Sequence, residues 1–217
     1  MPVHRWNKLD QEPVYPESFP KETIAIFTSA ANGDPNAQVA LGTIYLKGEI
    51  VPANTSEAVR WYEKAALGGS ATAGMTLAQL YLRGEYFEKD PATAIGWLEK
   101  AASMGDTKAM HRLGSIYAKG KLAPKDLGLA LFWFQKAAKG GNSTAQLIYG
   151  LMLRDGKGVE AAPREALKWL TQATQGNLTA ENMAMAVKAK NTLTQFLRDT
   201  PDTNIKNSLK TGGETAA

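Results

Sequence analysis

Residues that could carry out catalysis are scarce in this chain. Histidine occurs only as His4 and His111, and cysteine does not occur. Neither histidine has a second histidine or a group of carboxylates at a spacing that suits a metal ion. A chain without cysteine also lacks disulfides, zinc–thiolate sites and cysteine nucleophiles. We therefore expect no metal site and no cofactor.

The remaining polar residues do not point to an enzyme either. The segment G-K-G-V at 156–159 lacks the longer glycine–lysine–serine/threonine motif that cradles phosphate. Most Asp and Glu stand beside Lys or Arg on predicted helix surfaces, where they are solvated. We expect a protein that is not an enzyme and has no small-molecule substrate, and an enzyme stays as a weaker alternative.

The charge pattern argues against nucleic acid and membrane. Lys and Arg number 25 against 21 Asp and Glu, for a net charge of +4. The two signs alternate, as in Arg60, Glu63 and Lys64, and no run of five like charges occurs. Nucleic-acid binding is therefore a second weaker alternative. Residues 1–20 contain no apolar run long enough for a membrane helix, so we expect a cytoplasmic protein, or a periplasmic one if a signal peptide was removed before Met1.

A tandem repeat of 36 residues organises the chain. It is marked by four evenly spaced tryptophans, Trp61, Trp97, Trp133 and Trp169. An alanine stands three residues before each, a large apolar residue follows directly, and Ala-Ala, or Ala173-Thr174 in the last copy, comes one turn later. These positions form one apolar stripe on an α-helix, which we call helix B. A period of this length is the mark of stacked repeats.

A second apolar stripe precedes helix B in every copy, and we call it helix A. It is anchored in the four copies by Leu41, Leu77, Leu113 and Tyr149, and each is followed by a small residue, Gly42, Ala78, Gly114 or Gly150. These small residues would let the paired helix approach closely, so each repeat is predicted to be a helical hairpin. Capping residues flank helix A, namely Asp34, Ser70, Asp106 and Asn142 before it and Gly48, Gly84, Gly120 and Gly156 after it.

The pattern A-x-x-x-L-G-x-x-Y-x-x-G, then a loop ending in Asp, then A-x-x-W-[YFL]-x-K-A-A-x-x-G, resembles the Sel1-like repeat, a relative of the tetratricopeptide repeat. The resemblance implies an all-α fold, a right-handed α-solenoid of four 36-residue hairpins with capping helices at both ends. The predicted organisation begins with an extended N-terminal arm at residues 1–20 and a capping helix at 21–33. Four repeats follow at 34–69, 70–105, 106–141 and 142–177. A second capping helix at 178–199 and a flexible tail at 200–217 complete the chain. The buried tryptophans are expected to hold the hairpins together.

The resemblance also implies that helix A of each repeat lines a concave groove. Removing the core stripe leaves one row of Val39, Met75, His111 and Leu147, which predicts apolar side chains along the middle of the groove. A second row of Lys47, Arg83, Lys119 and Arg154 predicts a cationic edge. The other groove candidates lie between these two rows, and they are Thr43, Gln79, Ser115 and Leu151.

These features predict a scaffold that binds a protein partner. The partner is expected to be a peptide segment or a folded domain, with acidic or C-terminal carboxylate groups, and the chain is expected to be a monomer when free. The N-terminal arm could fill the groove instead. A narrower alternative is an immunity or inhibitor protein that neutralises one bacterial toxin or effector.

Overall fold

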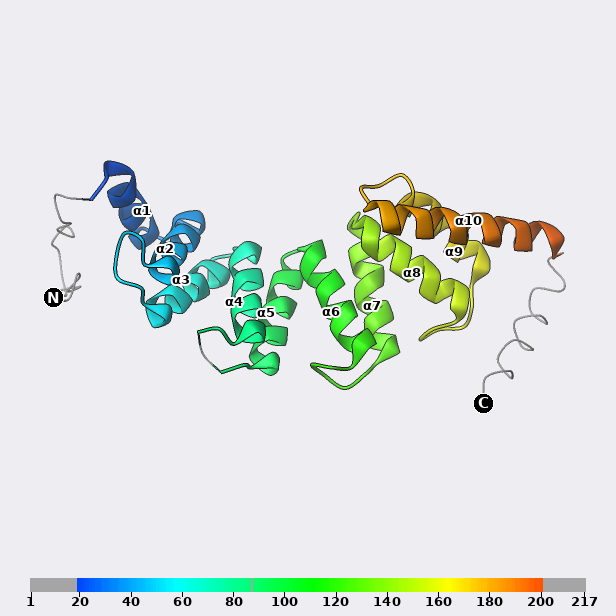
Figure 1. Cartoon of the computed structure of the whole chain (residues 1–217), viewed down its shortest axis with the longest axis horizontal. Helices are drawn as coiled ribbons and strands as arrows, with labels where there is room; N and C mark the ends of the chain where they lie inside the picture. The colour runs from blue at the N-terminus through cyan, green and yellow to red at the C-terminus, as the bar shows by residue number, and fades with distance from the viewer. Residues whose placement is uncertain (1–18, 87, 201–217) are drawn as a thin grey trace. The chain divides into compact units, whose positions relative to one another are not determined.

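The fold is all-α in the computed structural model, which describes residues 19–86 and 88–200 (Figure 1). Within these residues ten helices form and no strand does. Their bounds are α1 Lys21–Ala31, α2 Pro35–Lys47, α3 Thr55–Leu67, α4 Ala71–Arg83, α5 Pro91–Ser103, α6 Thr107–Lys119, α7 Leu127–Lys139, α8 Ser143–Asp155, α9 Pro163–Ala173 and α10 Ala180–Asp199. Most of the predicted arm, 1–18, and of the predicted tail, 201–217, lies outside the described residues.

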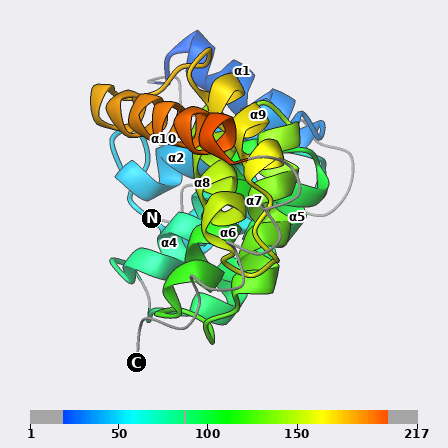
Figure 2. The ribbon, with the colours of Figure 1, turned by 90° about the vertical axis from the view of Figure 1, so that its right-hand side faces the viewer.

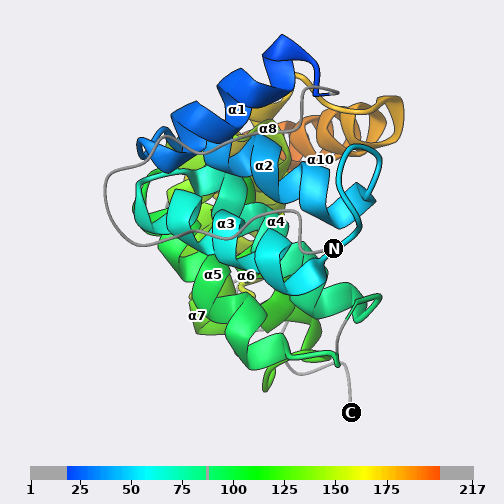
Figure 3. The same ribbon diagram turned by 90° about the vertical axis from the view of Figure 1, so that its left-hand side faces the viewer.

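Each repeat folds as the predicted helical hairpin. Helix A packs against the helix B that follows it, in the pairs α2 with α3, α4 with α5, α6 with α7 and α8 with α9. The chain divides into two compact units, one holding α1 to α5 and ending at Met104, the other holding α6 to α10 and beginning at Gly105. In the first unit α1 packs along α2 (Figure 3), and in the second α10 packs on α9 and α8 (Figure 2).

Side-chain caps fix where the helices begin. In α6 the Asp106 carboxylate accepts a hydrogen bond of 2.7 Å from the Ala109 backbone N–H, and the three other predicted helix A caps make the same kind of bond. Three of the four helices B are capped likewise, whereas α9 begins after Ala162, which has no side-chain acceptor. At the other end of helix A, the predicted glycines take φ values of 66° to 71°, which terminates each helix in the left-handed region.

The small residues of helix A allow close contact with helix B, as predicted. A Cβ atom added to Gly114 would lie 2.9 Å from the Phe134 ring, and one added to Gly150 would lie 3.0 Å from Leu170 Cγ. The residues that fill this space are almost fully buried, and they follow the repeat tryptophans directly: Tyr62, Leu98, Phe134 and Leu170. Close packing of large against small residues therefore holds each hairpin together.

The predicted burial of the four tryptophans is complete for one of them and partial for three. Trp61 is 4% exposed, but Trp97, Trp133 and Trp169 are only half-buried. The core stripe of helix B is centred one residue later, so each of these indoles lies at its edge. In α9 the Trp169 indole N–H donates to the Glu165 carboxylate, 3.3 Å away, which keeps its polar edge near solvent.

The last helix covers the fourth repeat with a narrow face, and Val187 lies off that face at 37% exposed. The buried residues of α10 are Ala186, Ala189 and Leu193, with Phe196 and Leu197 partly buried against the same core. Two alanines let α10 lie close to the hairpin beneath it. In the first unit, α1 contributes Phe27 and Ala30 to the core, and Ile26 packs partly buried against it.

Candidate protein-binding cleft

A cleft of about 510 Å³ lies in the second unit. Its walls come from α6, α7, α8 and the loops that connect each helix A to its helix B. The residues that line it are Ser115, Ala118, Lys119, Lys125, Leu127, Phe134, Ile148, Leu151, Met152, Asp155 and Lys157. We call this surface the lysine-rimmed cleft.

The floor of the lysine-rimmed cleft is apolar. Phe134 and Met152 are buried in the core of the second unit, with Ile148 and Leu151 packed partly buried against it. These side chains are held by the α7 and α8 stripes, so the floor is a surface of the core itself. Ile148 and Leu151 therefore supply the apolar surface that a partner could contact.

Two loops bring lysines to the rim. Gly120 ends α6 with φ of 68°, and a Cβ atom added there would lie 2.7 Å from the Lys125 Cβ. The Asp126 backbone N–H then donates to the Tyr117 carbonyl, at 3.0 Å, which closes this loop against α6. The later loop places Lys157 beside α8 through a backbone hydrogen bond of 3.0 Å to Met152. The loop geometry therefore sets the position of both lysines.

The carboxylate of the cleft is already neutralised. Asp155 is bonded by Arg154 Nε at 2.6 Å and by Lys157 Nζ at 3.0 Å. Burial acts to raise the pKa of Asp155, but the hydrogen bonds from Arg154 and Lys157 outweigh it and lower that pKa below its usual value. Lys119 and Lys125 are different, because among the described residues neither forms an ion pair. The rim therefore presents two unpaired positive charges.

The residues of the predicted cationic edge have acidic neighbours in the first unit but lysine neighbours in the second. Lys47 lies 3.8 Å from Glu49, and Arg83 lies 3.7 Å from Glu85, so an acid two residues later accompanies each cation of the first unit. At the same register the second unit has Lys121 and Lys157. The change from Glu to Lys leaves Lys119 without the acid that its counterparts have.

Three of the predicted groove residues come together in the cleft, namely Ser115, Lys119 and Leu151. Arg154 joins them indirectly through Asp155. Leu147 does not, because it is 1% exposed and belongs to the same core as Ala186 and Leu193 of α10. The prediction that Leu147 is exposed in a groove is therefore wrong, since α10 adds to the core at this point.

The other predicted groove residues do not line the lysine-rimmed cleft. Val39 packs partly buried against the core, and the Thr43 hydroxyl bonds the Val39 carbonyl at 3.0 Å and the Tyr62 hydroxyl at 2.9 Å. Met75 is half-buried, and Gln79 is exposed. His111 is half-buried with its ring centroid 5.7 Å from that of Phe134. Burial lowers the pKa of His111, and the charges of Arg112 and Lys119 lower it further.

Sequence reasoning missed the loop and helix B side of the cleft, chiefly Lys125, Leu127 and Lys157. A signal for Lys157 was present in the repeat alignment, where Glu49 and Glu85 correspond to Lys121 and Lys157. Lys125 had no such signal, because Lys89 occupies the same register in the second repeat. Leu127 and Ile148 had no such signal, because apolar residues of helices are expected in the core.

The model of the Sel1 repeat matches this chain at residues 35–70, 76–106, 107–142 and 143–178. The chain belongs to the Sel1 repeat family. Repeats of this family generally serve as modules for binding other proteins and do not generally carry catalytic activity. No curated protein matches the chain.

Solved structures of Sel1 repeat proteins share the fold. A Sel1 repeat protein from Oxalobacter formigenes is 31% identical, with a TM-score of 0.63 over 73% of this chain and 65% of that one. A protective antigen of uropathogenic Escherichia coli is 25% identical, with a TM-score of 0.41 over 83% of this chain and 50% of that one. This chain therefore spans less than two thirds of either protein.

An immunity protein from Pseudomonas aeruginosa is also similar to this chain. It is 19% identical, with a TM-score of 0.41 over 80% of this chain and 71% of that one. This likeness is one of fold alone, so it adds nothing to the inhibitor alternative. Within the part of the chain that the structure describes, no helix is both long and apolar enough to cross a membrane.

Proposed function

We propose that this Sel1 repeat protein is a scaffold whose lysine-rimmed cleft binds an acidic segment of a partner protein. The observation that carries this function is the pair of unpaired cations, Lys119 and Lys125, at the edge of an apolar floor. A partner segment would place one apolar side chain on Ile148 and Leu151 and a carboxylate at each lysine. We propose further contacts at the groove candidates of α2 and α4 in the first unit and at one residue of α6. These are Val39, Thr43, Lys47, Met75, Gln79, Arg83 and His111.

The two parts of the cleft have different tasks. Burying an apolar side chain of the size of leucine contributes about 1.5–3 kcal/mol. Charge pairs at an exposed rim contribute about 0.2–1 kcal/mol each and mainly select among partners and speed association. We therefore expect the floor to supply most of the affinity and the rim to supply the preference for acidic segments.

Selection from a random peptide library displayed on phage tests this function. We expect the enriched peptides to share an apolar residue flanked by Asp or Glu. The double variant Lys119→Glu/Lys125→Glu should lower the affinity of the best peptide at least about tenfold, because it replaces two attractive charge pairs with repulsive ones. Isothermal titration calorimetry at low salt measures this change.

Lys168→Glu is the matched control, since Lys168 is an exposed lysine of α9 outside the cleft. It should change the affinity less than twofold. Equal weakening by Lys168→Glu and by the double variant would show that net charge, rather than the cleft, governs binding. Enrichment of peptides without acidic residues would contradict the proposed partner chemistry.

A further inference from the structure

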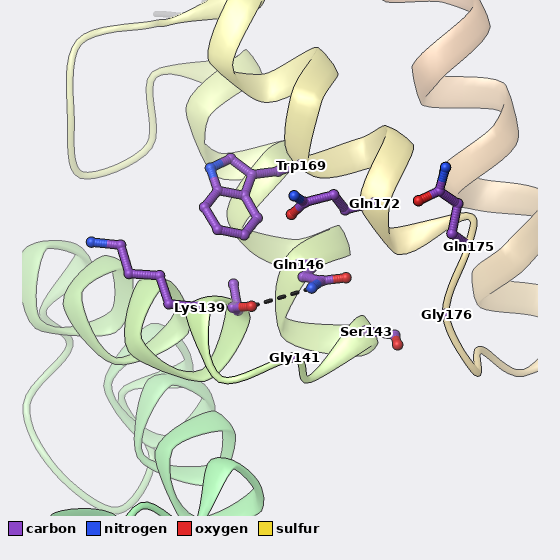
Figure 4. A pocket seen from close by; sticks show the side chains of 9 residues that line it. Lys139, Gly141, Ser143, Gln146, Trp169, Gln172, Gln175 and Gly176 are labelled. Atoms are coloured by element: carbon purple, nitrogen blue, oxygen red, sulfur yellow. Dashed lines mark hydrogen bonds between the residues drawn. The ribbon is translucent and has the colours of Figure 1, made fainter.

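A second pocket, of about 460 Å³, lies in the same unit between the end of α7, the start of α8 and the end of α9 (Figure 4). It shares no lining residue with the lysine-rimmed cleft. Its character is polar, with an indole wall from Trp169 and amide or hydroxyl groups from Ser143, Gln146, Gln172 and Gln175. We call it the indole pocket.

The repeat pattern shows what is different about the indole of α9. In each of the first three repeats a lysine three residues after the tryptophan places its ammonium over the ring. The distances from the lysine Nζ to the ring centroid are 4.2 Å for Lys64 over Trp61, 5.9 Å for Lys100 over Trp97 and 5.4 Å for Lys136 over Trp133. These distances are those of cation–π contacts. The fourth repeat has Gln172 at this register.

The substitution of Gln172 for lysine leaves Trp169 without the intramolecular cation that its three counterparts have. The surroundings of the ring nevertheless favour positive charge. The Trp169 N–H bonds the Glu165 carboxylate at 3.3 Å, which places a negative charge at the edge of the indole. Gln172 and Gln175 add amide oxygens that can accept hydrogen bonds from an ammonium or guanidinium group.

The other polar groups of the indole pocket do not oppose a cation. Gln146 donates one of its two side-chain N–H groups to the Ala138 carbonyl at 3.2 Å, and its amide oxygen remains able to accept. Lys139 is the one charged residue of the lining, and its side chain extends away from Gln172 and Gln175 in Figure 4. The space beside the ring is therefore bordered by amide groups whose oxygens can accept from a cation.

We propose that the indole pocket binds a lysine or arginine side chain of a partner protein. The partner's cation takes the position over Trp169 that an intramolecular lysine takes in the other repeats, and its N–H groups donate to the amide oxygens of Gln172 and Gln175. The indole pocket would thus recognise a basic residue, in addition to the acidic segment bound at the lysine-rimmed cleft.

Nuclear magnetic resonance of the tryptophan side chains tests this proposal with small probes. Nα-acetyl-lysine methylamide and Nα-acetyl-arginine methylamide are titrated into the protein while the indole N–H signals are followed. We expect a saturable shift of the Trp169 signal, with smaller shifts of the Trp61, Trp97 and Trp133 signals, because those rings are already covered by lysine. Nα-acetyl-norleucine methylamide, which has the same stem without the charge, should leave the Trp169 signal in place.

Gln172→Lys is the decisive variant, because it installs the residue that the other three repeats carry. It should fold with an unchanged melting temperature and weaken the response to both cationic probes at least about fivefold. Asn191→Lys, which adds the same charge on the exposed side of α10, is the control and should keep the response. A full response in Gln172→Lys, an equal response to the norleucine probe, or equal shifts of all indoles would each overturn the proposal.

Discussion

The residue type at some positions of helix A is restricted by the neighbours that an added side chain would contact. An added Cβ atom would lie 2.9 Å from the Phe134 ring at Gly114, where it does not fit, and 3.1 Å from the Tyr62 ring at Gly42, where it would be tight. The sequence allowed this pairing to be predicted, because small and large residues recur at constant spacing. It did not show that the tryptophans lie one position away from the centre of the core, since an indole at a stripe's edge has the same periodicity as one at its middle.

Replacing Gly114 with alanine should destabilise the protein by about 1–3 kcal/mol, because the added methyl group lies 2.9 Å from the rigid Phe134 ring. The matched control is Gly96→Ala in α5, where nothing lies within 4 Å of an added Cβ. That change should stabilise the protein by about 0.5–1 kcal/mol, because alanine is the better helix former. Urea denaturation followed by circular dichroism measures both values, and equal effects would contradict the close contact of α6 with α7.

His111 should make folding sensitive to mild acid. Its pKa in the folded protein is lowered by burial, Arg112 and Lys119 from a value near 6.5. Above this pH both folded and unfolded states are neutral, so His111 has no effect. As the pH falls below 6.5 the unfolded state binds a proton first, and the free energy of unfolding decreases until the pH reaches the lowered pKa.

The variant His111→Met isolates this effect, because Met75 occupies the same register in the second repeat. The free energy of unfolding, measured in urea at pH 7.5 and at pH 5.5, should decrease less in the variant than in the original protein. An equal decrease in both proteins would show that His111 is readily protonated in the folded state.

Whole helices were the most predictable features of the chain. The caps and the 36-residue period placed helices A and B correctly because each hairpin is stabilised by its own local signals. The lysine-rimmed cleft was harder to predict, since half of its rim comes from loops whose path depends on left-handed glycines and backbone hydrogen bonds. Leu147 was misplaced for a similar reason, because the packing of α10 on α8 has no counterpart in the repeat pattern.

Helix α9 lacks the side-chain cap that the other helices B possess, which predicts an opportunity for stabilisation. Ala162→Asp should raise the free energy of unfolding by about 0.5–1 kcal/mol, because a carboxylate there can accept from a free backbone N–H of the first turn. Asp126→Ala, which removes the equivalent bond of 2.9 Å to Leu129 in α7, should lower it by about 0.5–2 kcal/mol. Thermal and urea denaturation give both values, and destabilisation by Ala162→Asp would contradict the equivalence of the two positions.

Across the whole molecule, repeated hairpins supply stability and differences between repeats supply specificity. The second unit contains both candidate sites, and each arises where one repeat departs from the others. Glutamate is replaced by Lys121, which lies two residues after Lys119, and by Lys157, which lines the lysine-rimmed cleft, and Gln172 replaces lysine at the indole pocket. Because the rim charges are exposed, binding of an acidic segment should weaken as salt increases.

The most direct test of the lysine-rimmed cleft is a map of backbone amide shifts on binding the best acidic peptide from the display selection. We expect the largest shifts at Ser115, Lys119, Lys125 and Leu151, and we expect Lys119→Glu/Lys125→Glu to remove them. Largest shifts around Trp169 and Gln172, or an unchanged map in the double variant, would contradict binding of the acidic segment at this cleft.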